Sequence, residues 1–216
     1  TYTLSEGSQN GWQQTESPDA VTAASGMNVT GQDFGNFQSV SISGMKFNDL
    51  NGNGVKDTND IGLSGWKIYL SGTSSDSTLT DTNGEYTFTA LGPGTYTLSE
   101  GSQNGWQQTE SPDAVTAASG MNVTGRDFGN YELGIITGIK FNDANGNGVK
   151  ETGENGIVNW TIRVSGTKVD SATTDTNGVY TIMELPQGSY TVSEDVQNDW
   201  KQTYPESGTH SVSIDT

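Results

Sequence analysis

Large apolar residues occupy every second position in several stretches of this chain. Residues 66–70 and 160–164 carry such side chains at alternate positions, and in residues 86–89 and 95–99 they alternate with threonine and serine. Successive side chains of a β-strand point to opposite faces, so this period of two predicts strands with one buried face and one hydroxyl-rich face. We find no stretch of convincing helical periodicity, and the sequence therefore predicts an all-β fold.

Turn signals separate the predicted strands. Residues 81–84 and 175–178 each end in the Asn-Gly pair of a two-residue hairpin, and residues 91–94 contain a Gly-Pro-Gly break. About seven short strands with such turns between them are typical of an immunoglobulin-like sandwich. We therefore expect antiparallel β-sandwich domains of immunoglobulin-like size.

A long internal repeat sets the size of each domain. Residues 1–37 recur at residues 95–131, an offset of 94 positions, and residues 44–72 align more loosely with residues 138–166 at the same offset. The first two segments differ at two positions, where Arg126 and Tyr131 take the places of Gln32 and Phe37. A repeat of this length corresponds to one small domain rather than to a solenoid unit.

The repeat predicts three consecutive parts joined by short linkers. Residues 1–37 are expected to form the C-terminal part of one sandwich, residues 38–131 a complete sandwich, and residues 132–216 a sandwich that lacks its last strand. The chain starts in the middle of a strand pattern, so we expect that its natural start is missing. The linker around residues 38–43 is too short for neighbouring domains to tumble freely.

Two loops carry the pattern of a calcium-binding loop. Residues 49–60 and 143–154 both match D-x-[DN]-x-[DN]-G-x5-[DE], in which alternate positions supply the oxygen ligands that calcium requires. The expected ligands of the first loop are Asp49, Asn51, Asn53, the backbone carbonyl of Val55, Asp57 and Asp60. The expected ligands of the second loop are Asp143, Asn145, Asn147, the backbone carbonyl of Val149, Glu151 and Glu154.

The alternative is that Asn, Asp and Gly simply gather in turns. Two full-length matches at equivalent positions of a repeat favour a bound metal over that alternative. Two ligands in each loop are neutral amides, and Asp60 is shorter than the usual glutamate. We therefore expect weak, extracellular-type affinity for Ca²⁺, with a Kd on the order of 10⁻⁵ to 10⁻³ M. Strands flank both loops, so neither belongs to an EF-hand helix pair.

The strongly negative net charge limits which kinds of molecule the chain is expected to bind. The formal net charge is −17 and the isoelectric point is about 4.1, which argues against nucleic acid and suits bound cations. No apolar run approaches the ~20 residues that cross a bilayer. The chain has one histidine and no cysteine, so catalytic triads, histidine metal sites and disulfides are unsupported.

Together these motifs resemble a known family, the B-type repeats of serine-aspartate-repeat surface proteins. The resemblance rests on the segments GMKFNDLNGNGVKD, GLSGWKIYL, TDTNGEYTFTALGPGTYTLSE and DFGN, and it covers essentially the whole chain. Such repeats belong with the collagen-adhesin B-type, prealbumin-like sandwiches. The resemblance implies a rigid, calcium-loaded spacer in an extracellular cell-surface stalk or fibre, with no catalysis on an outside substrate.

The resemblance also implies an intramolecular crosslink. In many collagen-adhesin B-type domains a lysine of the first strand attacks an asparagine amide near the last strand, and ammonia leaves. Carried over to this chain, Lys46 is the nucleophile, Asn130 the electrophile and Glu100 the catalyst. Strand alternation places Glu100 on the buried face, where a carboxylate needs a partner or a proton. The flanking repeats carry the partial sets Lys140 with Glu194, and Glu6 with Asn36. The alternative is a Lys–Glu salt bridge at the sheet edge, with Asn130 in a turn.

The leading functional prediction is a structural segment of a stalk, fibre or surface-layer protein. Its expected partners are neighbouring repeats of the same chain and like chains in a fibre or surface layer. The alternative is an adhesin module that binds glycan or protein. An exposed aromatic cluster in only one repeat would favour the adhesin. The near-identical copies at residues 1–37 and 95–131 favour a spacer, because repetition lengthens a stalk.

Overall fold

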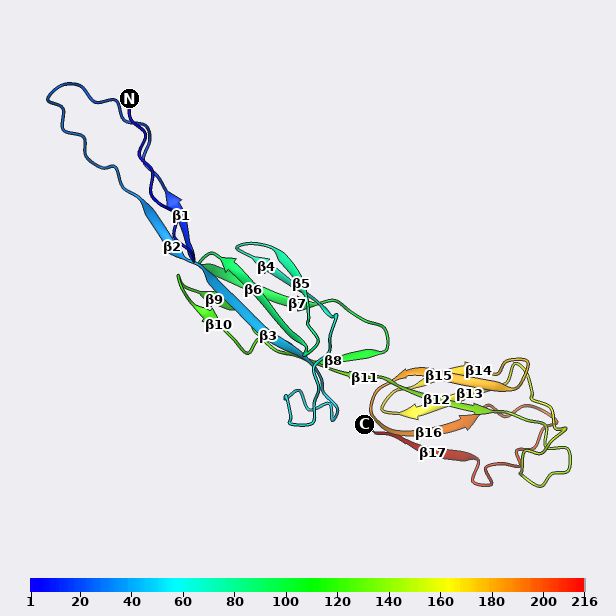
Figure 1. The fold of residues 1–216 in the computed structure, drawn as a ribbon. Coiled ribbons are helices and arrows are strands. Elements are labelled where there is room, and N and C mark those ends of the chain that lie inside the picture. The colour runs from blue at the N-terminus through cyan, green and yellow to red at the C-terminus, as the bar shows by residue number, and fades with distance from the viewer. Residues whose placement is uncertain (216) are drawn as a thin grey trace. The chain divides into compact units, whose positions relative to one another are not determined.

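The computed structural model describes residues 1–215, and every regular element in them is a β-strand (Figure 1). The predicted all-β fold of tandem sandwich domains is confirmed. Thr216, the last residue of the predicted third part, lies outside the described residues. The chain forms two compact units. Unit 1 comprises residues 1–49, 54–102 and 108–129, and unit 2 comprises the other described residues.

The first eleven strands lie within residues 1–132. They are β1 (Trp12–Glu16), β2 (Gly35–Gln38), β3 (Val40–Asn48), β4 (Lys67–Gly72), β5 (Asp76–Leu79), β6 (Glu85–Leu91), β7 (Gly94–Glu100), β8 (Trp106–Glu110), β9 (Val115–Ala117), β10 (Asn122–Val123) and β11 (Phe128–Glu132). The remaining strands are β12 (Gly134–Ile139), β13 (Thr161–Gly166), β14 (Asp170–Thr173), β15 (Val179–Leu185), β16 (Gly188–Glu194) and β17 (Thr209–Ile214).

Two sheets build the central sandwich. One has five strands in the order β10-β3-β11-β8 with β6 also on β3, and the other has the order β5-β4-β7-β9. Ile42 and Phe88 are paired across β3 and β6 in the first sheet, and both are buried together with Ile68 and Tyr96 of the second sheet. These are the inward positions of the alternating pattern. The β10–β3 pairing is parallel, which the expectation of a purely antiparallel sandwich did not include.

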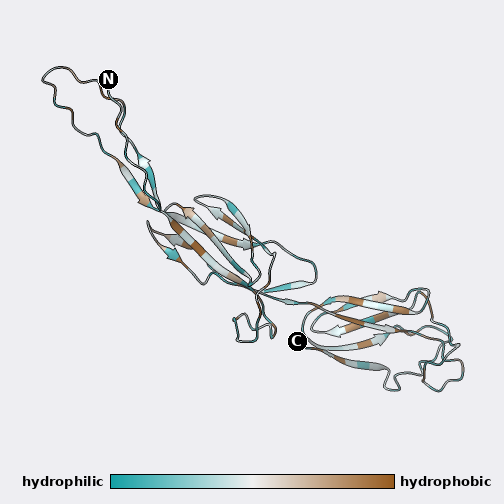
Figure 2. Ribbon diagram, viewed as in Figure 1, coloured by the Kyte–Doolittle hydropathy of each residue, from teal (hydrophilic) through white to brown (hydrophobic). Residues whose placement is uncertain are grey.

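Unit 2 repeats part of this arrangement. Its four-stranded sheet has the order β14-β13-β16-β17, the counterpart of β5-β4-β7-β9. Among residues 1–215, β12 pairs only with β15, in a two-stranded sheet. The core between them contains Trp160, Ile162, Leu185 and Tyr190. Figure 2 shows the hydrophobic positions gathered on the sandwich strands and the hydrophilic positions on the connecting loops.

The N-terminal residues form a separate ribbon within unit 1. Strand β1 pairs antiparallel with β2, with Gln13 opposite Phe37, and a single bridge joins Tyr2 to Val21. Residues 1–215 contain no helix of the length and apolar character that a membrane crossing requires.

Candidate calcium loops and buried lysine–glutamate pairs

The loop of residues 143–154 is closed at its base by backbone pairing. The Ile157 amide donates to the Lys140 carbonyl at 2.9 Å, the Asn142 amide donates to the Asn155 carbonyl at 2.9 Å, and an isolated bridge joins Phe141 to Gly156. This stem brings the first and last predicted ligands of the loop to the same end.

Asp143 organises the first half of the loop. Its Oδ1 accepts the amides of Gly146 at 2.8 Å and Asn147 at 3.1 Å, and its Oδ2 accepts the Gly148 amide at 2.7 Å. Burial alone would raise the pKa of Asp143. A hydrogen bond with Thr203 and the three backbone amides outweigh burial and lower that pKa below its usual value. Asp143 is therefore held as a carboxylate.

The middle ligands converge on Glu151. Asn145 Nδ2 lies 3.1 Å from Glu151 Oε2, and Asn147 Nδ2 lies 2.6 Å from Glu151 Oε1. Glu154 closes the loop, because its Oε1 accepts the Ala144 amide at 2.8 Å and its Oε2 accepts the Glu151 amide at 3.1 Å. Five oxygen-bearing side chains at the predicted positions therefore fold around one loop.

The first loop repeats the same local contacts. The Gly54 amide donates to Asp49 Oδ2 at 2.8 Å, as Gly148 does to Asp143, and the Asp57 amide donates to Asp60 Oδ2 at 2.8 Å, as Glu151 does to Glu154. Lys56 and Lys150 occupy equivalent positions, and each Nζ donates to the backbone carbonyl of the final ligand at 2.6 Å. These three contacts therefore recur in both loops, although the first loop ends in a shorter acid.

The donor set fits a weakly held calcium ion rather than a transition metal. Within residues 1–215 no three Asp, Glu, His or Cys side chains gather closely enough to hold a metal by themselves. A calcium site in residues 143–154 must therefore also use the oxygens of Asn145 and Asn147 and a backbone carbonyl, as the loop pattern predicts. Both amides now point a nitrogen at Glu151, and rotation about the last side-chain torsion exchanges that nitrogen for the oxygen.

The structure brings Lys46 and Glu100 together in unit 1. Lys46 Nζ lies 2.9 Å from Glu100 Oε2, with side-chain exposures of 0% and 8%. Lys46 Nζ also lies 4.6 Å from the centre of the Trp66 ring. Burial lowers the pKa of Lys46 to about 8, and the hydrogen bond and charge of Glu100 oppose that shift only in part. A fraction of this lysine is therefore a neutral amine near neutral pH.

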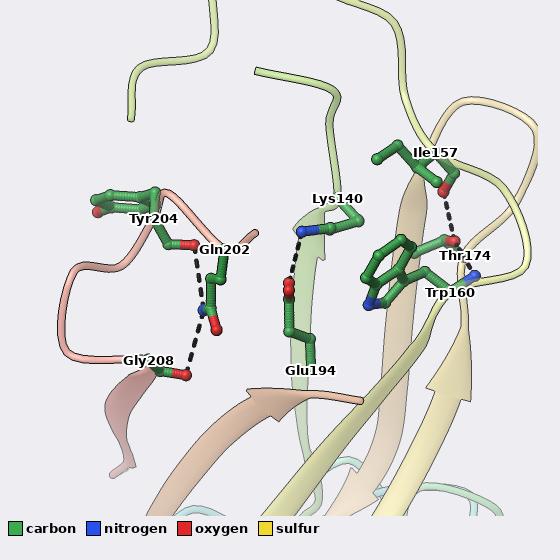
Figure 3. A network of polar contacts seen from close by, with 8 residues as sticks. All are labelled: Lys140, Ile157, Trp160, Thr174, Glu194, Gln202, Tyr204 and Gly208. Carbon is green, nitrogen blue, oxygen red and sulfur yellow. Dashed lines mark hydrogen bonds and ion pairs between the residues drawn. The ribbon is translucent and has the colours of Figure 1, made fainter. Parts of the chain in front are cut away.

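The equivalent pair in unit 2 is more open. Lys140 Nζ lies 2.7 Å from Glu194 Oε2, but the side chains are 14% and 10% exposed (Figure 3). Lys140 Nζ lies 4.6 Å from the Trp160 ring, as Lys46 does from Trp66. In both pairs the lysine therefore packs on a buried tryptophan, and the side chains of the Lys140–Glu194 pair are more exposed than those of the Lys46–Glu100 pair.

The predicted asparagines lie on strands. Asn130 is buried on β11, and β11 is the hydrogen-bonded neighbour of β3, the strand that carries Lys46. In the N-terminal ribbon, Asn36 Nδ2 donates to Glu6 Oε1 at 2.9 Å. The alternative that placed Asn130 in a turn is therefore wrong, because alternation along β11 keeps Asn130 on the buried side with Phe128.

Comparison with known proteins identifies the family. The model of the SdrD B-like domain matches residues 40–135 and again residues 134–215. The chain belongs to the SdrD B-like domain family. Serine-aspartate repeat-containing protein F of Staphylococcus epidermidis is 29% identical over 190 residues, which are 78% of this chain and 11% of that protein. Protein C of the same kind from Staphylococcus aureus is 30% identical over 175 residues, 72% of this chain and 19% of that protein.

This SdrD B-like segment spans less than a fifth of the length of those relatives. Among solved structures, a streptococcal ancillary pilin aligns with 82% of this chain and 59% of its own, at 17% identity and a TM-score of 0.43. A minor pilin of Streptococcus agalactiae covers 82% of this chain and 90% of its own, at 11% identity and a TM-score of 0.38. Family and relatives place the segment at the extracellular cell surface, as a structural or adhesion-related module.

One supporting residue of each SdrD B-like domain, a threonine, was missed by the sequence reasoning. The Thr174 hydroxyl accepts the Trp160 amide at 2.9 Å and donates to the Ile157 carbonyl at 2.6 Å (Figure 3). Thr80 makes the same two bonds with Trp66 and Leu63. They fix the tryptophan on which the lysine rests. The signal was present, because lysine, tryptophan and threonine recur at the same spacing in both repeats.

Proposed function

We propose that this segment is a calcium-stabilised spacer of a cell-surface stalk or fibre, built from tandem SdrD B-like domains. Repetition supports a spacer over a ligand-binding module, because residues 95–131 differ from residues 1–37 at only two positions. A site that recognises one ligand needs no such repetition, whereas a stalk gains length from every added copy.

The loop of residues 143–154 is the observation that carries the calcium proposal. Asp143, Asn145, Asn147, Glu151 and Glu154 already lie around one loop. Backbone amides donate to Asp143, Asn145 and Glu154, and the Asn147 side-chain amide donates to Glu151. Bound calcium supplies positive charge that offsets the repulsion among these acids and joins the two ends of the loop. A ligand that binds only the folded form stabilises it, by about 1.4 kcal/mol at about 1 mM Ca²⁺ for a Kd on the order of 10⁻⁴ M.

Calcium titration of the whole chain tests this proposal. We expect thermal unfolding of the second domain to shift upward with millimolar Ca²⁺, and the combined change Asp143→Asn with Glu154→Gln to remove that shift. Asp19→Asn is the matched control, since Asp19 is exposed and lies outside both loops. An equal shift in the loop variant, or an equal shift with Mg²⁺, would contradict the assignment of the site to these ligands.

We further propose that Lys46 and Asn130 form an isopeptide bond in the complete domain. The neutral Lys46 amine attacks the Asn130 side-chain carbonyl carbon, a C–N bond forms, the bond to Nδ2 breaks, and ammonia leaves with the proton that the amine gives up. Glu100 lies within hydrogen-bond distance of the amine and is mostly buried, which suits proton transfer in both directions. The bond would join β3 to β11 and resist extension of the domain along the chain.

A further inference from the structure

The tip of the first candidate calcium loop is part of unit 2. Residues 50–53 lie in that unit together with residues 103–107 and the strands from β12 to β17. Two of the four tip residues, Asn51 and Asn53, are predicted calcium ligands. The residues of unit 2 that surround the tip therefore bear directly on a candidate calcium site.

A glutamine of unit 2 binds this tip. Gln187 Nε2 donates to the Leu50 carbonyl at 2.8 Å, although the two residues are 137 positions apart in the sequence. The oxygen of the same amide lies against Gly52, since a β-carbon at Gly52 would be 3.3 Å from Gln187 Oε1. Both ends of one side-chain amide therefore contact the loop tip.

An aromatic ring of β11 completes the contact. A β-carbon at Gly52 would lie 3.5 Å from each of two carbons of the Tyr131 ring. Gly52 has a φ of +66°, a left-handed conformation that glycine adopts without strain. The tip is therefore in contact with the ring of Tyr131 as well as with the amide of Gln187.

The turn that carries Gln187 is anchored to the core of unit 2. It joins β15 to β16 and begins at Leu185, which is fully buried. Tyr190 Oη donates to the Pro186 carbonyl at 2.7 Å, so a buried tyrosine fixes the residue before Gln187. Gln187 is therefore presented to the loop by a braced turn.

Gln187 contacts the loop at positions that calcium does not use. The predicted ligands in this half of the loop are its first, third and fifth residues. Leu50 and Gly52 are the second and fourth residues, and these are the two that Gln187 meets. The ion and the glutamine therefore bind different atoms of the same short segment, and one does not exclude the other.

We propose that Gln187 and Tyr131 hold the first calcium loop in its binding conformation, so that this contact and calcium binding to residues 49–60 strengthen each other. Both order the same segment, so whichever forms second loses less conformational entropy. Such coupling is reciprocal and has one free energy. The inference rests on the proposed calcium function and adds to it two residues outside the twelve-residue loop pattern.

Gln187 distinguishes this turn from its counterpart in unit 1. At the repeat offset of 94 it aligns with Pro93, which has no side-chain amide. The aromatic residue is common to both repeats, because Phe37 aligns with Tyr131 and its ring lies against Gly92 of the equivalent turn. The glutamine is therefore the residue whose removal tests the coupling most specifically.

Calcium titration with one loop disabled measures the coupling. The full chain with Asp143→Asn and Glu154→Gln retains residues 49–60 as its calcium loop. In this background Gln187→Met removes the amide and keeps the length of the side chain. By isothermal titration calorimetry we expect the Kd for Ca²⁺ to rise about 3- to 10-fold, the range that follows from loss of one partly buried hydrogen bond. Gln197→Met, at an exposed glutamine of the same unit, is the matched control and should change the Kd by less than about 1.5-fold.

A second pair of variants tests the aromatic side of the contact. Tyr131→Ala should weaken calcium binding at least about threefold, whereas Tyr131→Phe keeps the ring and should change it by less than about 1.5-fold. Circular dichroism checks that each variant is folded. An unchanged Kd in Gln187→Met would overturn the coupling and leave the calcium function in place. No calcium binding by the background protein would contradict the calcium function of this loop, and the coupling with it.

Hydrogen exchange in EDTA tests the contact without calcium. The Gly54 amide donates to Asp49 Oδ2 at 2.8 Å, so its exchange is slowed while the loop keeps this conformation. By NMR we expect this amide to exchange at least about threefold faster in Gln187→Met than in Gln197→Met. Equal rates would show that Gln187 does not order the loop and would overturn the proposal even if calcium binds.

Discussion

Residues 1–37 and 95–131 have almost the same sequence but different structures. In the second segment β7 is a regular strand with Tyr96 at 0% exposure, whereas the equivalent Tyr2 in the first segment is 65% exposed and makes only an isolated bridge. Strands equivalent to β1 and β2 are present in both segments, as β8 and β11. The sequence of a strand therefore determines which side chains share a face, but not whether that face is buried.

The difference arises from the neighbouring strands. β7 pairs with β4 over residues 96–100 and with β9 over residues 94–96. The first segment has no counterpart of β4 among the described residues, so its residues 2–6 have no long partner. An isolated ribbon is only marginally stable in water, and a packed sandwich supplies the apolar burial that orders the remaining strands.

The largest expected effect comes from changing the same phenylalanine in the two contexts. Phe128→Ala removes a fully buried ring and should lower the free energy of unfolding by about 3–5 kcal/mol. Phe34→Ala removes a partly exposed ring and should cost less than about 1 kcal/mol. Urea denaturation of both full-length variants measures the difference. Equal losses in the free energy of unfolding would show that the two phenylalanines lie in similar environments.

A smaller effect is expected from the buried lysine as pH rises. Without a crosslink, as in Asn130→Ala, the pKa of Lys46 is about 8 when folded and 10.5 when unfolded. The unfolded state therefore binds more protons between these values, and the stability of unit 1 should rise from about pH 8 to pH 10 by on the order of 1–3 kcal/mol.

The predicted rise in stability is limited at high pH by Tyr86, and a lysine variant serves as its control. Tyr86, whose pKa is raised by burial, reverses the trend above its ordinary value near 10 because its ionisation favours the unfolded state. Lys46→Met in the same Asn130→Ala background should lose the rise below pH 10. A rise that persists in that variant would assign it to other groups.

The smallest effect is expected from making the two segments more alike. Arg126→Gln gives the second segment the residue of the first, and we expect a stability change within about 1 kcal/mol. The contacts of Arg126 to Ser43 and Tyr86 use its backbone amide and carbonyl, which the substitution retains. Thermal unfolding beside the Asp19→Asn control measures the change. A loss of several kcal/mol would mean that this difference, not the missing strands, separates the two contexts.

Much of the fold was predictable because the signals are local. The period-two alternation marked the strands, the Asn-Gly pairs marked the hairpins, and the repeat offset aligned Lys140 with Lys46 and Glu194 with Glu100. Strand alternation predicted the buried position of Glu100, and its pairing with Lys46, which the family resemblance implied, is present at 2.9 Å. The calcium ligands and the isopeptide bond remain predictions.

What the sequence did not reveal depends on distant pairing. The parallel contact of β10 with β3 joins segments far apart along the chain, and no local pattern marks it. Residues 200–206 also show that strand formation depends on a neighbouring strand. They align with β8, yet they form no strand, because β8 is ordered against β11 and β12 has no such neighbour among residues 1–215.

The central claim is that the lysine chemistry is complete only where β3 and β11 occur in one sandwich. The most direct test is the denatured intact mass of the 216-residue monomer beside its Lys46→Ala and Asn130→Ala variants. We predict that the 216-residue chain is short by one ammonia and not two, because no counterpart of β11 pairs with β12 among residues 1–215, and that both variants have full mass. Full mass in all three proteins would contradict the claim and leave Lys46 and Glu100 as a buried ion pair.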